Sequence, residues 1–423
     1  MLENKGRITE KFSTKNEGII IVHNNEKYRL IIKSQTIINL KEYNIGDIIS
    51  FSGKKFNGKY SEEYNEIVVE KIKVLKKCLL NNSGCAISKS TSFKGIKEKQ
   101  FFHTKMIKDI NSIIRIEQAA TIYNVLRKTL TNHSFVECKT PILTDAYQGG
   151  SALAFKTYVN YKHRESYLRT NSLRPLMIYI CGGMDRVYEI GDYFRNGSTG
   201  KMHSVPYTAL EIYATNINYE EMIEFAKVIL ANIFKNLDMF DCISDINEIE
   251  YVGFSEYIKK MDFEKFEIKN LKDYFIYKEL EYNDNNNYHN INVLYKTFKE
   301  EILKKDQKLK IIHSLPAGIS PFVDRKSDSE AFLKRAFIVF KGYTIIEITY
   351  CSNDFDIITT EIKKQQEYLE KNVEKAIDSK ENTGYMHALK MGILPTSTLT
   401  MSIERFISLI CDDEDINEYK IVI

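Results

Sequence analysis

The sequence predicts an α+β protein, in which a small N-terminal β-barrel precedes a larger part that mixes strands and helices. Apolar and polar side chains alternate in short strand-like runs over residues 1–80, and helical periodicity first appears after residue 110. A chain of 423 residues is too long for one ordinary hydrophobic core and suits two or three domains. We therefore expect a domain boundary between these two parts.

The N-terminal part carries about five short strands. Turn sequences NNEK, NIGD and NGKYSEE separate the runs "GIIIVHN", "KYRLIIK", "DIISFSGKKF" and "NEIVVEKIKVL". This density of strands suits a small closed barrel, and the OB-fold is the common basic example. Such barrels bind single-stranded nucleic acid by stacking bases on exposed aromatic rings above a positive groove. The candidates for this role, each with an ordinary surface or core position as its alternative, are Phe51, Phe56, Tyr60, Lys54 and Lys55.

Charge is unevenly spread along the chain. Residues 1–110 hold 21 Lys and Arg against 12 Asp and Glu, a net charge of +9, whereas the whole chain has +3. A basic N-terminal third suggests a module that faces a polyanion such as RNA. The alternative is an AT-rich genome that uses Lys freely, since Ile and Asn are also abundant. Composition alone leaves both interpretations open.

Several classes of protein are excluded or disfavoured by absent patterns. No run of 18 uncharged apolar residues exists, and the N-terminus MLENKGRITE lacks the apolar segment of a signal peptide, so we expect a cytoplasmic protein without a membrane segment. The seven cysteines are scattered without a C-x-x-C pair, which argues against a disulfide framework and a zinc ribbon. There is no G-x-G-x-x-G, Walker loop, H-E-x-x-H or G-x-S-x-G.

The larger part begins after a polar linker. A helical repeat of Ile116, Ala119, Ala120, Tyr123, Leu126 and Leu130 leads into "SFVECKTPIL", where Pro141 suits an edge or interface strand. Further helices are expected at about 172–181, 219–236 and 358–376, among strand-like runs. The predicted domains are an OB-fold at 1–85, a linker at 86–110 and a large domain at 111–423.

A series of motifs in this large domain resembles one enzyme family. In order, they are "SFVECKTPIL", "GGSALAF", "YLRTNSL", "GGMDRVYEIGDYFRNGSTGKMHSVPYTALEIY", "HSLPAGISPF", "GYTIIEITYCSND" and "ALKMGILPTSTLTMSIERF". Their order and spacing resemble the class II aminoacyl-tRNA synthetases of the lysyl, aspartyl and asparaginyl group, and most of all the lysyl enzymes. The first, fourth and last are similar to motifs 1, 2 and 3 of that group.

This resemblance implies a fold and a reaction. The large domain should be an antiparallel sheet flanked by helices, and the chain should form a homodimer through its 110–145 region. The barrel would correspond to the anticodon-binding domain, so tRNA or another RNA is an expected partner. The reaction would activate an amino acid or other small carboxylate with ATP, forming an adenylate, and then pass the acyl group to tRNA or another acceptor.

The resemblance also assigns roles to residues. Arg195 would contact the α-phosphate, His203 the outer phosphates and Arg405 the γ-phosphate, while Tyr207 would stack on adenine. Arginine suits these roles because its planar fork meets phosphate oxygens with two parallel hydrogen bonds. Arg195 and Arg405 are thus the predicted catalytic residues. The segments that bind the amino acid in the family point here to Arg169, Gly149, Gly150, Glu211 and Asn353.

Several family carboxylates and glycines are absent. Gly197 stands where a Glu reads the adenine amino group, and Leu173 stands where a Glu binds the substrate α-amino group. The two acidic magnesium positions hold Thr344 and Cys351, and three motif 3 glycines are replaced by Thr398, Thr400 and Ser402. Since Mg²⁺ requires oxygen ligands, we expect it to bind poorly; the remaining candidate ligands are Glu347 and Asp354.

Two functions therefore stay open. The first is a lysyl-tRNA synthetase-like ligase with altered substrate specificity. The second is a catalytically inactive paralog that binds tRNA or a protein partner through its basic barrel. Ancestry favours the first and the missing acids favour the second, while fold similarity alone does not choose between them.

Overall fold

The computed structural model describes residues 4–14, 17–24, 26–34, 36–56, 64–79, 111–145, 152–197, 199–254, 271–284, 290, 293–298, 300, 308–316, 322–326, 329–372 and 383–417. The chain divides into two compact units, residues 1–119 with 417–423 and residues 120–416. Each unit is described by itself. The predicted linker at 86–110 lies outside the described residues, so its boundaries stay a prediction.

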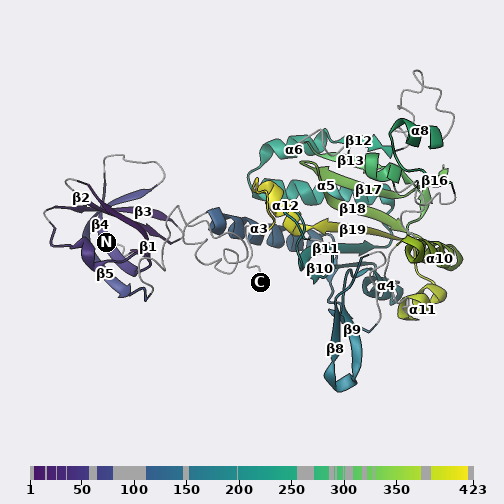
Figure 1. Cartoon of the computed structure of the whole chain (residues 1–423), viewed down its shortest axis with the longest axis horizontal. Helices are drawn as coiled ribbons and strands as arrows, with labels where there is room; N and C mark the ends of the chain where they lie inside the picture. Colours follow the sequence, from purple (N-terminus) through teal and green to yellow (C-terminus); the bar gives the residue numbers. More distant parts are fainter. Residues whose placement is uncertain are drawn as a thin grey trace. The chain divides into compact units, whose positions relative to one another are not determined.

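Five strands of the first unit close into a barrel (Figure 1). They are β1 (Asn4–Ser13), β2 (Glu17–His23), β3 (Lys27–Lys33), β4 (Ile48–Lys55) and β5 (Asn65–Lys76), and their order around the barrel is β1-β2-β3-β5-β4. β3 and β5 pair in parallel and the other neighbours are antiparallel. Alternation along each strand turns apolar side chains inward, where the core includes Ile8, Ile20, Val22, Leu30 and Ile49. The predicted barrel is confirmed.

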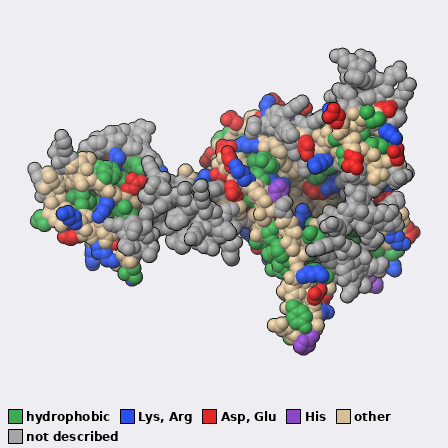
Figure 2. Space-filling view, viewed as in Figure 1, with side chains coloured by type: hydrophobic (Ala, Val, Ile, Leu, Met, Phe, Trp, Pro, Cys, Tyr) green, Lys and Arg blue, Asp and Glu red, His purple; other side chains and the backbone are tan. Residues whose placement is uncertain are grey.

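One candidate base-stacking residue of the barrel takes its alternative position in the core. Phe51 is 1% exposed and packs edge-to-face on Tyr28 with ring centres 5.2 Å apart, because the alternation along β4 turns it inward together with Ile49. The basic pair Lys54 and Lys55 is exposed at the end of β4. Figure 2 shows Lys and Arg side chains on the described surface of the barrel, with some acidic ones among them. Phe56 is half-buried, and Tyr60 lies outside the described residues.

The second unit is built on an eight-stranded sheet. Its strands, in spatial order, are β12 (Glu250–Gly253), β13 (Lys310–His313), β17 (Arg335–Phe340), β18 (Tyr343–Cys351), β19 (Thr396–Ser402), β11 (Tyr207–Ala214), β10 (Arg186–Tyr193) and β6 (Val136–Glu137). The outermost pairs, β12 with β13 and β10 with β6, are parallel, and all the pairs between them are antiparallel. This mostly antiparallel sheet confirms the α+β prediction, and the strand before Pro141 lies at its edge.

Helices cover one face of this sheet. α5 (Tyr219–Asn236) packs on β18 and β19, and α12 (Ile403–Ile410) packs on β11 and β18 (Figure 1). Asn218 and Glu221 form a capping box that fixes the start of α5. The strands turn alternate apolar side chains to this face, among them Leu210, Ile212, Ile346, Leu399 and Met401, all fully buried. The opposite face, which carries Glu211, is called the site face below.

A second group of helices lies at one end of the sheet. α4 (Leu173–Cys181), α10 (Phe355–Asn372) and α11 (Thr383–Met391) share a core with the ends of β11 and β18. A hairpin of β8 (Lys156–Val159) and β9 (Arg164–Leu168), joined through η2 (Asn160–Lys162) and paired with β7 (Leu143–Thr144), projects from the unit (Figure 1). The expected helices at 172–181, 219–236 and 358–376 correspond to α4, α5 and α10, and α10 begins slightly earlier than expected.

The remaining elements complete the described chain. They are η1 (Leu40–Glu42), α3 (Asn111–Asn132), α6 (Phe240–Asn247), α8 (Leu271–Tyr277), β14 (Leu315–Pro316), β15 (Arg325–Lys326) and β16 (Ser329–Leu333). The six cysteines in the described part of the chain are free thiols. No helix among the described residues is long and apolar enough to cross a membrane.

Candidate active site

A row of polar residues crosses the centre of the site face. Glu211 in β11 lies opposite Thr400 in β19, which lies opposite Glu347 in β18. One step along the same face, the Thr349 and Thr398 hydroxyls are 2.6 Å apart. Because alternate residues of a strand face the same way, the antiparallel register assembles this row from segments that lie far apart in the sequence.

Two arginines and a tyrosine meet beside this row. Arg195 follows β10, and its guanidinium carbon lies 5.2 Å from the ring centre of Tyr207, the first residue of β11. Arg405 projects from α12 and donates from Nη1 to the Thr344 carbonyl at 2.7 Å and from Nη2 to the Met202 carbonyl at 3.3 Å. The sequence assigned these three side chains to one nucleotide site, and the fold brings them together.

The two guanidinium groups concentrate positive charge around Tyr207. Burial lowers the pKa of Arg405, and the nearby positive charge of Arg195 lowers it further. The buried Nε of Arg405 has no hydrogen-bond partner, and no carboxylate in the described part of the chain forms an ion pair with either arginine. Burial also raises the pKa of Tyr207 to about 12, so that its phenol stays neutral. Guanidinium groups without a carboxylate partner are suited to hydrogen-bonding an anion.

The loop between β10 and β11 presents the third predicted ATP contact, His203. The backbone of His203 pairs with Gly200 through hydrogen bonds of 3.0 and 3.1 Å. Ile416 N donates to the Lys201 carbonyl at 2.8 Å, and the Lys201 ammonium forms an ion pair with Glu414. These contacts fix the loop from the C-terminal segment and leave the His203 side chain exposed.

Gly197 in the same loop is not required by packing. A Cβ at this position would meet no atom within 4 Å, so a larger side chain would fit. Packing therefore does not explain the glycine. Its consequence is chemical, because the loop lacks a carboxylate at the position where the resemblance expects one.

Glu211 is a buried acid at the centre of the site face. It is 6% exposed and accepts hydrogen bonds from the Tyr213 hydroxyl at 3.1 Å and the Thr400 hydroxyl at 3.2 Å. Burial raises the pKa of its carboxyl to about 7, and Glu347 adds to this effect, whereas the hydrogen bonds and Arg195 oppose it. At neutral pH this carboxyl is therefore close to half-protonated and takes up or releases a proton readily.

The two candidate metal ligands are held by other groups. Glu347 Oε1 accepts a hydrogen bond from Arg335 Nη2 at 2.7 Å, and Asp354 Oδ1 accepts one from Ile357 N at 2.9 Å, which caps α10. No three His, Cys, Asp or Glu side chains gather at a possible metal site among the described residues. Because Mg²⁺ prefers several free oxygen ligands, this donor set does not fit a dedicated magnesium site.

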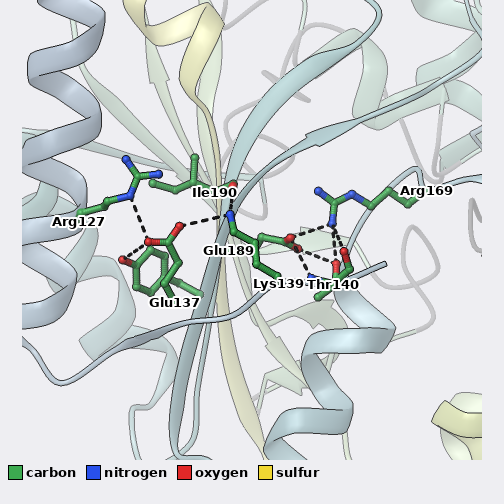
Figure 3. Close-up of polar contacts among 8 residues, drawn as sticks. Arg127, Glu137, Lys139, Thr140, Arg169, Glu189 and Ile190 are labelled. Atoms are coloured by element: carbon green, nitrogen blue, oxygen red, sulfur yellow. Dashed lines mark hydrogen bonds and ion pairs between the residues drawn. The ribbon is translucent and has the colours of Figure 1, made fainter. Parts of the chain in front are cut away.

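Arg169 takes part in a buried network at the β10 end of the polar row, where Glu189 lies opposite Glu211 (Figure 3). Its Nη1 lies 2.9 Å from Glu189 Oε1 and 2.6 Å from the Thr140 hydroxyl, and its Nε donates to the Asp192 carbonyl at 2.9 Å. The Arg169 and Glu189 side chains are 4% and 2% exposed. At Gly191, a Cβ would lie 2.3 Å from Arg169 Nη2. The predicted substrate residue Arg169 thus supports the wall formed by β10.

A second polar cluster lies next to this network (Figure 3). Glu137 in β6 accepts hydrogen bonds from Arg127 Nε at 3.1 Å and from the Tyr188 hydroxyl at 3.2 Å, and it lies 3.5 Å from Lys139 Nζ. The three partners join the edge strand to α3 and β10. This cluster stabilises the edge strand.

The remaining predicted substrate residues have separate positions. Asn353 Nδ2 donates to the Ile393 carbonyl at 3.0 Å, which ties the end of β18 to the segment before β19. Gly149 and Gly150 lie outside the described residues. Leu173 and Cys351, which stand at family acidic positions, both belong to the apolar core around α4 and α11.

The sequence reasoning missed two partners in the site. Arg335 pairs with the Glu347 carboxylate, and Glu189 pairs with Arg169. Strand alternation could have predicted which face of the sheet Arg335 takes, since Arg335 and Phe337 lie two apart in β17 and face the same side. The pairing itself depends on strand register and is not encoded in local spacing.

Comparisons with known proteins agree with this geometry. A sequence profile of the tRNA synthetases class II (D, K and N) matches residues 97–421. A lysine–tRNA ligase of Buchnera aphidicola subsp. Schizaphis graminum is 27% identical over 427 residues, covering 95% of this chain and 80% of the relative. The lysine–tRNA ligase of Clostridium botulinum (strain Langeland) is 27% identical over 450 residues, covering 98% and 84%. That of Mycoplasma genitalium is 24% identical over 396 residues, covering 88% and 77%.

Proposed function

Because the chain belongs to the class II tRNA synthetases of the D, K and N group, we propose that it is an ATP-dependent ligase. In this proposal it converts an amino acid or another small carboxylate to its adenylate and transfers the acyl group to tRNA or another acceptor. Its similar relatives are lysine–tRNA ligases. We propose that this chain differs from them in the substrate that it selects.

The proposal rests on Arg195 and Arg405, two neighbouring arginines that form no ion pair with a carboxylate among the described residues. The reaction joins a carboxylate to the α-phosphorus of ATP and releases pyrophosphate, so catalysis depends mainly on positioning and on neutralising phosphate charge. Arg195 binds the α-phosphate, Arg405 the γ-phosphate and His203 the outer phosphates. Tyr207 stacks on the adenine ring. The exposed guanidinium of Arg195 and the unsatisfied Nε of Arg405 support these roles.

Glu211 holds the amino group of the substrate in this proposal. Its carboxyl is buried on the site face, and a bound ammonium would favour its charged form. Asn353, which follows β18, is proposed to lie at the end of the site that holds the amino acid. Arg169 acts through Glu189, since their ion pair positions β10, from which Arg195 continues. Gly149 and Gly150, which lie outside the described residues, are proposed to contribute to the amino-acid site because their segment matches the family's substrate loop.

Enzymes of this family use ATP with Mg²⁺ in general. The carboxylates of Glu347 and Asp354 are held by protein donors here, so no catalytic step is assigned to a metal ion bound by this chain. Charge neutralisation falls to the arginines instead.

The proposal includes a homodimer and an RNA partner. Family members are typically dimeric, and the apolar side chains Val136, Ile142 and Leu143, from the region expected at the interface, are about half exposed in the single chain. The barrel with its basic Lys54 and Lys55 would bind tRNA or another RNA through phosphate contacts. A role in tRNA charging also implies a cytoplasmic location.

A second function is favoured by one observation. The acidic positions that hold metal and substrate in the family are Thr344, Cys351 and Leu173 here, and Cys351 is 2% exposed within an apolar core. This pattern supports a catalytically inactive paralog that binds tRNA or a protein partner.

Calorimetry with ATP on the full chain distinguishes the two functions. The ligase should bind ATP, and Arg195→Ala or Arg405→Ala should weaken binding at least tenfold, about 1.4 kcal/mol. Arg164→Ala is the matched control, because Arg164 is an exposed arginine of the β8–β9 hairpin, paired with Asp145. Absence of ATP binding, together with tRNA binding by the same preparation, would replace the ligase by the inactive paralog.

A further inference from the structure

The side of the barrel formed by β1, β4 and β5 is rich in positive charge. These three strands hold eight Lys and Arg against three Glu. Lys5 in β1 lies opposite Ser50 in β4, and Ser50 lies opposite Lys73 in β5. One step further along β5, Lys71 lies opposite Ser52. The strand register thus gathers lysines that are far apart in the sequence.

A second row crosses the same three strands. Arg7 lies opposite Ile48, and Ile48 lies opposite Lys76. Directly opposed residues of neighbouring strands point to the same side of a sheet, and alternate residues of one strand share a face. Both rows therefore lie on one face, called the basic face below. Its exposed lysines are Lys5, Lys71, Lys73 and Lys76.

The basic face is the outer side of the barrel. Phe51 in β4 belongs to the buried core, and Val74 in β5 packs against that core. In β1, a Cβ on Gly6 would lie 2.4 Å from Val22 Cγ1, which is also in the core. The residues that alternate with these three point outward, in agreement with the exposure of the four lysines.

The four lysines form an array without acidic partners among the described residues. The acids nearest to them in sequence pair elsewhere, Asp47 with Lys77 and Glu70 with Lys54. Two residues along a strand span about 7 Å and two strand spacings about 10 Å, so the charges stand close together. Like charges at such spacing repel each other, and a polyanion would remove this repulsion.

A Lys-rich composition alone does not explain this array. The chain holds 57 Asp and Glu against 60 Lys and Arg, so a random surface would mix both signs. On the basic face the described rows contain cations, with the uncharged Ile48, Ser50 and Ser52 of β4 between them. The face therefore has the charge pattern of a surface that meets a polyanion.

The basic face offers charge without a stacking surface. No described residue of its rows is aromatic, and Phe51 of the same strand points into the core. Sequence-specific binding of single-stranded RNA relies on stacking against aromatic rings and on hydrogen bonds to base edges. Phosphate contacts position a nucleic acid and carry no sequence information directly.

We propose that the basic face binds the phosphate backbone of RNA and does not read its bases. The inference deepens the proposed function and rests on its RNA partner, because the family match favours RNA over an anionic membrane as the polyanion. Selection among RNAs then belongs to other residues of the chain, while the basic face holds the bound RNA in position.

Filter binding of bulk tRNA to the full chain at a series of KCl concentrations tests this surface. Each phosphate contact contributes roughly 0.7–0.9 to the slope of log affinity against log salt concentration. The double variant Lys73→Gln with Lys76→Gln should therefore lower the slope by about 1.5, and weaken binding at least about tenfold at about 0.1 M KCl. Polyuridine should show the same change in slope, because the basic face does not read bases.

Two matched double variants serve as controls. Lys73→Arg with Lys76→Arg keeps both charges and should keep the slope. Lys33→Gln with Lys41→Gln removes the same charge from exposed lysines of β3 and η1, and should change the slope by less than about 0.5. All these side chains are exposed, so thermal unfolding should match that of the unmodified chain.

The outcomes separate this inference from the ligase. An unchanged slope in the Lys73 and Lys76 glutamine variant, or an equal loss in the Lys33 and Lys41 control, would overturn the basic face as an RNA site. Loss of binding to vesicles of phosphatidylcholine and phosphatidylglycerol, with tRNA binding unchanged, would assign it to a membrane instead. Failure of the unmodified chain to bind tRNA at low salt would overturn this inference and leave the ATP site intact, whereas failure to bind ATP would overturn the ligase alone.

Discussion

Removing one partner of the buried Arg169–Glu189 pair should destabilise the second unit strongly. The two side chains are 4% and 2% exposed, their charged atoms lie 2.9 Å apart, and Thr140 donates to the Glu189 carboxylate from both its amide and its hydroxyl. Arg169→Met leaves a buried carboxylate without a counter-charge, and Glu189→Gln leaves a buried guanidinium. Breaking a buried pair in this way costs about 3–5 kcal/mol.

The double variant Arg169→Met with Glu189→Gln should cost less than the sum of the single changes. Neither charge then remains, and neutral groups are cheaper to bury than an isolated ion. We expect a coupling energy of about 1–3 kcal/mol between the two positions, as found for residues in one network.

Hydrogen-exchange mass spectrometry is the suitable assay, because peptides that cover β10 and β11 report on the second unit without interference from the barrel. Exchange through global opening should accelerate about 100-fold or more in each single variant, since about 1.4 kcal/mol corresponds to a factor of ten. Arg164→Met, which removes an exposed pair with Asp145, should leave the same peptides within about 0.5 kcal/mol of the unmodified chain. Single variants that match this control, or strictly additive effects in the double variant, would refute the reasoning.

Three further predictions concern other parts of the chain. The pKa of the Glu211 carboxyl is raised from 4.5 to about 7, so its protonated form favours the folded state, fully below pH 4.5 and no longer once the pH has risen through 7. In urea denaturation, the free energy of unfolding of the unmodified chain should fall by about 3 kcal/mol relative to Glu211→Gln across that window. Parallel pH profiles of the two chains would contradict this. Phe51→Ala should destabilise the barrel by about 3–5 kcal/mol, whereas Lys54→Ala should leave its thermal unfolding unchanged and weaken RNA binding in a filter assay; equal unfolding of the two variants would contradict the buried position of Phe51. Gly191→Ala should destabilise β10 by about 1–3 kcal/mol, because its methyl group would displace Arg169; unchanged hydrogen exchange in β10 would show that the arginine moves at no cost.

Local sequence patterns predicted the elements of the fold well. Apolar alternation identified the barrel strands, and the Asn218–Glu221 capping box at the start of α5 agrees with the expected helix at 219–236. For Phe51 the core alternative is the correct one, and the sequence left it open because alternation gives two faces without saying which one is inside. Its ring packs on Tyr28, which comes from another strand, and only closure of the barrel decides that orientation.

The grouping of the residues proposed to bind the nucleotide could be expected from the sequence, while the ion pairs around them could not. Arg195, Tyr207 and Arg405 follow from motif order, and the fold brings them together. The partners of Arg169 and Glu347 depend on register between strands, which local spacing does not encode.

The decisive measurement for the ligase is ATP–pyrophosphate exchange by the full chain across the twenty standard amino acids and L-2-aminoadipate. We expect exchange with at least one of these substrates, and its loss by at least about 100-fold in Arg195→Ala, in line with the removal of one preorganised group that stabilises transition-state charge. Exchange with none of these substrates, in a preparation that is folded and binds tRNA, would contradict adenylate formation and leave the RNA-binding paralog as the function of this chain.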